Sequence, residues 1–154
     1  MDQISVQLAT DVPAPNPVLL QQWCQKTLDD LGTQGEITIR IINALEMAQF
    51  NQQFRHKIGP TNVLSFPANL PPGIDYPLLG DILICADVVN QEAQEQEKSH
   101  HAHWAHMVVH GTLHLLGFDH QIEDDALVME NHEIEILRQL GYTNPYEVRL
   151  RDDV

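Results

Sequence analysis

The segment Asp81-Ile82-Leu83-Ile84-Cys85 carries apolar side chains on both of its alternating faces. A strand with one buried face alternates apolar and polar residues, whereas a strand that is apolar on both faces lies inside a sheet. The segment therefore predicts an interior strand.

Three other segments have the pattern of strands. Ile4–Leu8 alternates apolar with polar side chains, which predicts a half-exposed strand. Glu36–Ile42 places three isoleucines on one face, and Thr61–Phe66 is a further, short candidate. Together with the interior segment they predict a sheet of four strands.

Five segments have helical spacing or helix-end signals. Asn16, Asn43, Asp87 and Ser99 stand where a side chain can accept a hydrogen bond from the first turn of a helix, so each predicts an N-cap. Glu46 follows Asn43 by three residues, which resembles a capping box. The expected helices cover residues 17–31, 44–54, 88–97, 100–116 and 127–140.

These elements predict a single α+β domain over residues 1–154. We expect a mixed four-stranded sheet packed with four to five helices, with the histidine-containing helix 100–116 at its centre. A chain of 154 residues, 43% of them apolar, can bury enough surface to fold without a metal. A bound metal is then expected to serve chemistry.

Charge and composition limit the possible partners. The chain has 8 Lys and Arg residues against 22 Asp and Glu residues, a formal net charge of −14 that opposes electrostatic binding of nucleic acid. Arg40, Arg55 and Lys57 nevertheless lie close together in the sequence. No leader pattern or long apolar run is visible, so we expect a soluble cytoplasmic protein with no membrane partner. Cys24 and Cys85 are expected to be buried free thiols.

Residues His110–His120 have the sequence HGTLHLLGFDH, with the spacing of metal ligands. Residues four apart in a helix project from the same face, so His110 and His114 can bind one ion. His120 would point away if the helix continued, but Gly117 readily takes the left-handed conformation that turns the chain back. Three imidazoles leave the fourth position of a zinc ion to water, as in catalytic sites. We therefore expect one Zn²⁺ held by His110, His114 and His120.

The neighbouring residues refine this hypothesis. His100, His101 and His103 are expected to face solvent. His106 lies one turn before His110 and could be an alternative ligand, but it is expected to pack or to support a ligand. The spacing resembles that of zinc peptidases of the metzincin type, but Gly111 stands where those enzymes have the glutamate that acts as general base. The sequence thus predicts the metal site without the base for peptide hydrolysis.

Three segments together carry a resemblance to a known family. They are His110–His120, Pro60–Pro67 (PTNVLSFP) and Leu79–Ile82 (LGDI), in the family's order and separation within residues 36–141. On these segments the chain resembles the YbeY-type rRNA maturation endoribonucleases, a bacterial family of metal-dependent enzymes. Asn62 is one of the two residues that this family usually carries at its position.

The resemblance implies a single-strand-specific, zinc-dependent endoribonuclease. It implies cleavage of small-subunit ribosomal RNA, including 3′-end maturation, and a part in ribosome quality control. The family's metal ligands correspond to His110, His114 and His120, and its functionally important arginine corresponds to Arg55. The planar guanidinium of Arg55, the one catalytic candidate outside the metal ligands, can hold a phosphate oxygen.

Two other functions fit the same residues. One is a metallohydrolase of peptide or another small substrate; the other is a ribosome-associated module whose structural zinc has a fourth protein ligand, such as His106 or Asp119. Ser65 is expected to donate a hydrogen bond either near the site or to backbone. The expected partner is single-stranded or ribosomal RNA rather than DNA. Because the net charge opposes RNA binding, the ribosome or a ribosomal protein is expected to supply much of the affinity.

Overall fold

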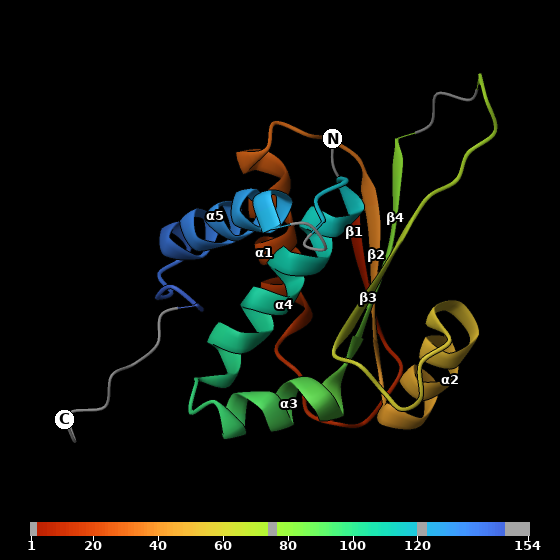
Figure 1. Cartoon of the computed structure of the whole chain (residues 1–154), viewed down its shortest axis with the longest axis vertical. Helices are drawn as coiled ribbons and strands as arrows, with labels where there is room; N and C mark the ends of the chain where they lie inside the picture. Colours follow the sequence, from red (N-terminus) through yellow and green to blue (C-terminus); the bar gives the residue numbers. More distant parts are fainter. Residues whose placement is uncertain (1–2, 74–76, 120–122, 147–154) are drawn as a thin grey trace.

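The computed structural model describes residues 3–73, 77–119 and 123–146. Within them the chain forms four strands and five helices (Figure 1). Every helix in these ranges is too short or too polar to span a lipid bilayer. In chain order the elements are β1 (Gln3–Leu8), α1 (Pro17–Asp30), β2 (Glu36–Ile42), α2 (Ala44–Arg55), β3 (Val63–Pro67), β4 (Leu78–Cys85), α3 (Ala86–Glu95), α4 (His100–Leu115) and α5 (Glu123–Gln139).

The strands form one mixed sheet in the order β1-β2-β4-β3. β1 pairs in parallel with β2, β2 pairs in parallel with β4, and β3 is antiparallel to β4. The apolar segment Asp81–Cys85 belongs to β4, which has a neighbour on each side, so the predicted interior strand is confirmed. The strand begins before this segment, at Leu78.

Helices cover the two faces of the sheet unequally. α1, α4 and α5 lie on one side and α2 lies on the other (Figure 1). Ile82 and Ile84 of β4 belong to the large core with α1 and α4, whereas Leu83 and Cys85 belong to a smaller cluster with Met47 of α2. Both cysteines of the chain are buried free thiols, as predicted. The α+β fold with a mixed four-stranded sheet and five helices is therefore confirmed.

α4 is the central helix of the larger layer. It contacts α1, α3, α5 and the sheet, and Trp104, Val108 and Leu113 are fully buried. Burial of each such side chain contributes about 1.5–3 kcal/mol. The helix that carries His110 and His114 is thus held from several sides, in the central position that the sequence predicts.

Three of the predicted N-caps are confirmed. Asn16, Asn43 and Ser99 each accept a hydrogen bond from a backbone N–H of the following turn, at 2.9–3.0 Å. The side chain of Glu46, predicted to close a capping box, pairs with Arg40 at 3.3 Å. The starts of α1, α2 and α4 therefore follow from local sequence, because an N-cap needs only its own turn.

The predicted N-cap at Asp87 is wrong. β4 continues directly into α3, which starts at Ala86, so Cys85 occupies the N-cap position. Asp87 falls in the first turn, and its carboxylate accepts a hydrogen bond from the backbone N–H of Ala44 at 2.6 Å. The side chain therefore stabilises the start of α2 and ties α2 to α3.

Two other helix ends differ from the prediction by more than one residue. α3 ends at Glu95 instead of Glu97, because Glu97 has a left-handed φ of 55°. α5 begins at Glu123, earlier than the apolar spacing from Leu127 indicates. Neither difference changes the order or the packing of the elements.

Candidate active site

α4 carries two of the three predicted metal ligands on one face. The ring centroids of His110 and His114 lie 4.6 Å apart, with 78° between the ring planes. This is the arrangement expected for residues one turn apart. Both rings are partly buried, so they stand at the edge of the core.

The end of α4 follows the predicted glycine stop. Gly117 has a left-handed φ of 99°, and its N–H donates to the His114 carbonyl oxygen at 3.0 Å. The N–H of Phe118 donates to the Leu113 carbonyl oxygen at 3.1 Å, which completes a Schellman motif. The predicted third ligand, His120, lies outside the described residues.

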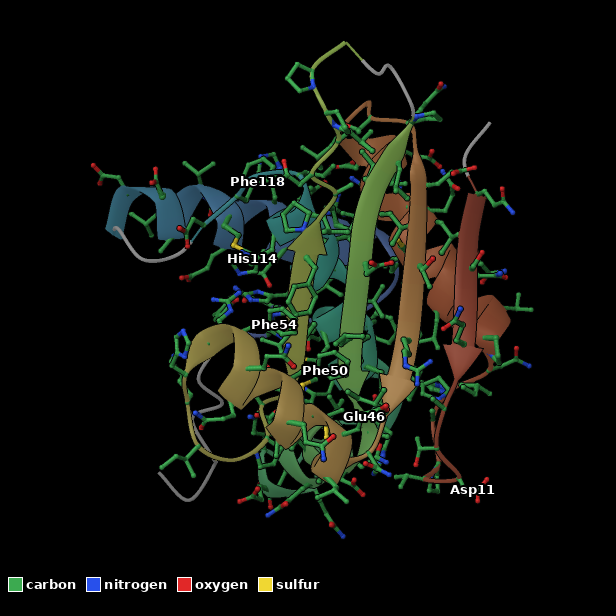
Figure 2. The ribbon with its side chains drawn as sticks, turned by 90° about the vertical axis from the view of Figure 1, so that its right-hand side faces the viewer. Asp11, Glu46, Phe50, Phe54, His114 and Phe118 are labelled. Carbon is green, nitrogen blue, oxygen red and sulfur yellow. The ribbon has the colours of Figure 1, made fainter. Side chains whose placement is uncertain are left out.

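A cavity of about 420 Å³ opens beside the two histidines. His110 and His114 of α4 line it together with Arg55, the last residue of α2. Figure 2 shows His114 beside the C-terminal end of α2, where Phe54 is labelled. Arg55, which lies far from His110 and His114 in the sequence, is thus brought to the same cavity as the two histidines.

The way α2 ends places positive charge at this cavity. His56 takes a left-handed φ of 56° and closes the helix. The buried side chain of Asn51 donates to the Gly59 carbonyl oxygen at 2.8 Å and folds the next loop back onto the helix. Arg55 and Lys57 are exposed and line the cavity. In a chain with a net charge of −14, these two cations outnumber Asp119, the one acidic residue among the described residues that line the cavity, and give it a local attraction for anions.

α4 approaches β3 and β4 closely at Gly111. A Cβ atom on Gly111 would lie 2.9 Å from Cγ2 of Ile82 and 3.1 Å from Cγ2 of Val63. The Ser65 hydroxyl donates to the Gly111 carbonyl oxygen at 2.8 Å, so the backbone-bonding role for Ser65 is confirmed. The glutamate that zinc peptidases carry at this position therefore has no room in this chain.

Behind the histidines, α5 contributes a buried glutamate that the sequence analysis missed. Oε2 of Glu133 lies 2.8 Å from Nε2 of His106 and 3.0 Å from Nδ1 of His110, and Oε1 accepts a hydrogen bond from the Tyr146 hydroxyl at 2.6 Å. Burial raises the pKa of Glu133, but hydrogen bonds from the two imidazoles outweigh it and lower the pKa to about 2. Glu133 is therefore a buried anion at neutral pH.

One sequence signal marks Glu133. It follows Met129 by four residues and precedes Ile136 and Leu137 by three and four, which is the spacing of a buried helical stripe. All four side chains are buried. An acidic residue inside an apolar stripe needs a partner, and here His106 provides one. The supporting role predicted for His106 agrees with this contact.

The predicted exposure of His103 is wrong. Its ring is buried, with Nε2 2.9 Å from Oε1 of Glu92. Glu92 also accepts a hydrogen bond from the side chain of Asn62 at 3.2 Å, so this pair supports the start of β3 beside the cavity. Burial lowers the pKa of His103, which keeps the ring neutral. His100 and His101 are exposed, as predicted.

The side chains at this end of α4 fit a divalent metal. One ligand atom from each of His106, His110 and Glu133 lies within 4.8 Å of the others, so these three residues could hold an ion. His110 also lies beside His114, at the wall of the cavity. Imidazole and carboxylate groups are ordinary ligands of zinc. The donor set is therefore suited to the predicted kind of cofactor.

Comparison with known proteins agrees with this fold and sequence. The family model described as endoribonuclease YbeY matches residues 9–141. The endoribonuclease YbeY of Pseudomonas syringae pv. tomato is 48% identical over 147 residues, which cover 95% of this chain and 89% of the relative. The solution structure of TM1509 from Thermotoga maritima has a TM-score of 0.57 at 23% identity, over 95% of this chain and 100% of that chain, and supports the fold. The chain therefore belongs to the endoribonuclease YbeY family, as its sequence predicts.

Proposed function

We propose that this chain is a metal-dependent endoribonuclease that cleaves single-stranded RNA in ribosomal RNA processing. Its substrate is small-subunit ribosomal RNA in 3′-end maturation and in ribosome quality control. Membership of an endoribonuclease family confirms the predicted class of enzyme. The observation that carries the proposal is a single cavity lined by the imidazoles of His110 and His114 and the guanidinium of Arg55.

One zinc ion is the proposed cofactor, with His110, His114 and His120 as its ligands. When bound, the ion supplies Lewis-acid chemistry that polarises a phosphodiester and activates a nucleophile. Neutral imidazoles leave its positive charge uncompensated toward an anionic substrate. His110 and His114 are held for this task by the rigid packing of α4.

Arg55 is the proposed contact to the substrate phosphate. Its guanidinium is exposed at the cavity and can donate two parallel hydrogen bonds to phosphate oxygens. Lys57 adds a second positive charge at the same cavity. This pairing of imidazoles with cations suits a phosphodiester, which needs a Lewis acid and charge neutralisation on its oxygens.

RNA is the partner that this enzyme class requires, and the remaining partners are proposals. We place the enzyme in the cytoplasm, with the ribosome or a ribosomal protein supplying affinity that a chain of charge −14 lacks. We also propose that residues 1–154 act as one domain. The four described strands form one sheet, and a large core joins α1, α4 and α5 to this sheet.

Peptide hydrolysis is not favoured for this chain. A side chain at Gly111 would meet Ile82 and Val63, so a general base in the manner of zinc peptidases does not fit. A structural zinc without activity is not favoured either, because the chain belongs to a family of endoribonucleases.

Cleavage of RNA by matched histidine variants tests the proposed function. We expect the purified chain to cut a single-stranded oligonucleotide and to spare the duplex of the same sequence. His114→Ala should lose both metal and cleavage while its circular dichroism stays unchanged. His100→Ala, which changes an exposed histidine at the other end of α4, should keep both. Wild-type cleavage by metal-free His114→Ala would reject the proposal.

A further inference from the structure

Glu133 of α5 is fully buried, and both of its oxygens are engaged. Oε2 lies 3.0 Å from Nδ1 of His110 and 2.8 Å from Nε2 of His106. Oε1 accepts a hydrogen bond from the hydroxyl of Tyr146 at 2.6 Å. The carboxylate thus links the segment after α5 to the helix that carries the proposed metal ligands.

The chemistry of the carboxylate determines where the protons lie. Oε2 lies at hydrogen-bond distance from one nitrogen of each of two imidazoles, where a carboxylate oxygen is the acceptor, so we place hydrogens on the ring nitrogens that face it. These are Nδ1 of His110 and Nε2 of His106. A neutral His110 with its proton on Nδ1 has its lone pair on Nε2, the nitrogen that can then bind a metal. Nδ1 of His106 is buried without a hydrogen-bond partner among the described residues, as suits an unprotonated nitrogen.

We propose that Glu133 is a positioning residue: it holds His110 in the Nδ1–H tautomer and so presents Nε2 to the metal, while Tyr146 fixes Glu133. The inference rests on the proposed function, because it takes His110 as a metal ligand. The ring of Tyr146 also packs edge-on against the ring of His106, with centroids 5.4 Å apart. Through Tyr146, the segment after α5 therefore contacts both Glu133 and His106.

Direct metal binding by Glu133, His106 and His110 is the competing assignment of the same atoms. Direct binding would require His106 and His110 to lose the ring protons that face Glu133, although both contacts have the length of hydrogen bonds. The cavity beside Arg55 is lined by His110 and His114, whereas Glu133 and His106 are buried. An ion between Glu133 and His106 would therefore be separated from the proposed phosphate contact, and the positioning role is favoured.

The tautomer of His110 can be measured without metal or RNA. Long-range ¹H–¹⁵N correlation spectra of the metal-free, labelled full chain distinguish protonated from unprotonated ring nitrogens. We expect the Nδ1–H form of His110 in the wild type and a mixture of forms in Glu133→Gln. A dominant Nε2–H form in the wild type would overturn the proposal. A tautomer unchanged by Glu133→Gln would also overturn it, because Glu133 would then have only a structural role.

Zinc affinity, measured by competition with a chromophoric chelator, gives a second readout. Loss of a carboxylate that hydrogen-bonds a metal-binding histidine typically weakens metal binding by about 10- to 100-fold. We expect a loss of this size for Glu133→Gln. Tyr146→Phe should weaken zinc binding by a smaller factor. Glu135→Gln changes an exposed acid on the same helix and should bind as the wild type does. Wild-type affinity in Glu133→Gln would contradict the proposal. If Glu133→Gln fails to fold, the His110 tautomer in the wild type and the zinc affinity of Tyr146→Phe test the proposal instead.

A further pair of variants separates positioning from direct ligation. His106→Gln keeps a side-chain donor for Glu133 and is expected to retain zinc affinity within about tenfold, whereas His114→Ala is expected to lose the ion. A greater loss of zinc affinity in His106→Gln than in His114→Ala would overturn the proposal. Cleavage of RNA is measured separately. A chain with the predicted tautomer and zinc affinities that cleaves no RNA would contradict the proposed function and not the role of Glu133.

Discussion

The hydroxyl of Ser65 donates a hydrogen bond to the carbonyl oxygen of Gly111 at 2.8 Å. This contact joins β3 to α4 at the residue that follows His110. Because Gly111 has no side chain, α4 approaches the sheet more closely than any other residue there would allow. The helix with the proposed ligands and the strand that lines the cavity are thereby fixed relative to each other.

The close packing at Gly111 predicts a stability effect. Gly111→Val should reduce the free energy of unfolding by about 1–3 kcal/mol, because the new side chain meets Ile82 and Val63. Thermal unfolding of the metal-free protein measures this change. Valine has a higher helix propensity than glycine, so propensity cannot account for a loss at Gly111, and Ala102→Val, which places valine in the first turn of the same helix, should cost less than about 1 kcal/mol. Equal losses in both variants would contradict the packing argument.

The contact between Asp87 and Ala44 predicts a second effect on stability. Asp87→Ala should cost about 0.5–2 kcal/mol, the range for removing the partner of an N-terminal backbone donor. Chemical denaturation followed by circular dichroism measures it. Glu95→Ala, at the exposed last turn of the same helix, is the matched control and should stay within about 0.5 kcal/mol of the wild type. No difference between the two variants would show that the bond to Ala44 contributes nothing.

Arg55→Ala should lower cleavage far more than metal content. A hydrogen bond to a charged group contributes about 1.5–3 kcal/mol, so the rate on single-stranded RNA should fall about tenfold to a hundredfold. Arg138→Ala is the control, because Arg138 is an exposed residue of α5 paired with Glu135. Metal analysis and cleavage rates are compared for both variants. Equal losses of metal and activity in Arg55→Ala would indicate a folding role for Arg55.

The charge distribution predicts how binding to isolated RNA depends on salt. Arg55 and Lys57 are the two cations among the described residues that line the cavity, so binding should be weak, and its double-logarithmic slope against salt should be shallow, about −1.4 for two phosphate contacts to a single strand. Titration with a labelled oligonucleotide at several salt concentrations measures it. Tight binding with a steep slope would contradict the view that the ribosome supplies the affinity.

The features predicted from sequence are those that depend on local pattern. Asn16, Asn43 and Ser99 bind backbone donors within their own turn, and Gly117 ends α4 by its own conformation. The period-two pattern of β2 and the apolar faces of β4 likewise indicate their places in the sheet. Each of these signals is complete within a few residues.

The features that sequence analysis missed depend on partners in other elements. His103 can be buried because Glu92 of α3 accepts a hydrogen bond from its ring, and Asp87 accepts one from the backbone N–H of Ala44 in α2. The position of Glu133 behind His110 requires α5 to cross α4 at that point. Packing of distant helices decides these contacts, so spacing along the chain does not contain them.

Metal analysis combined with RNA digestion, before and after chelation, tests the central claim most directly. We expect about one zinc ion per chain, cleavage of single-stranded RNA that stops when a chelator removes the ion, and recovery when zinc is restored. The same treatment of His100→Ala should give the same loss of cleavage with the chelator and the same recovery with zinc. Undiminished cleavage by a chain from which the metal has been stripped would contradict the account.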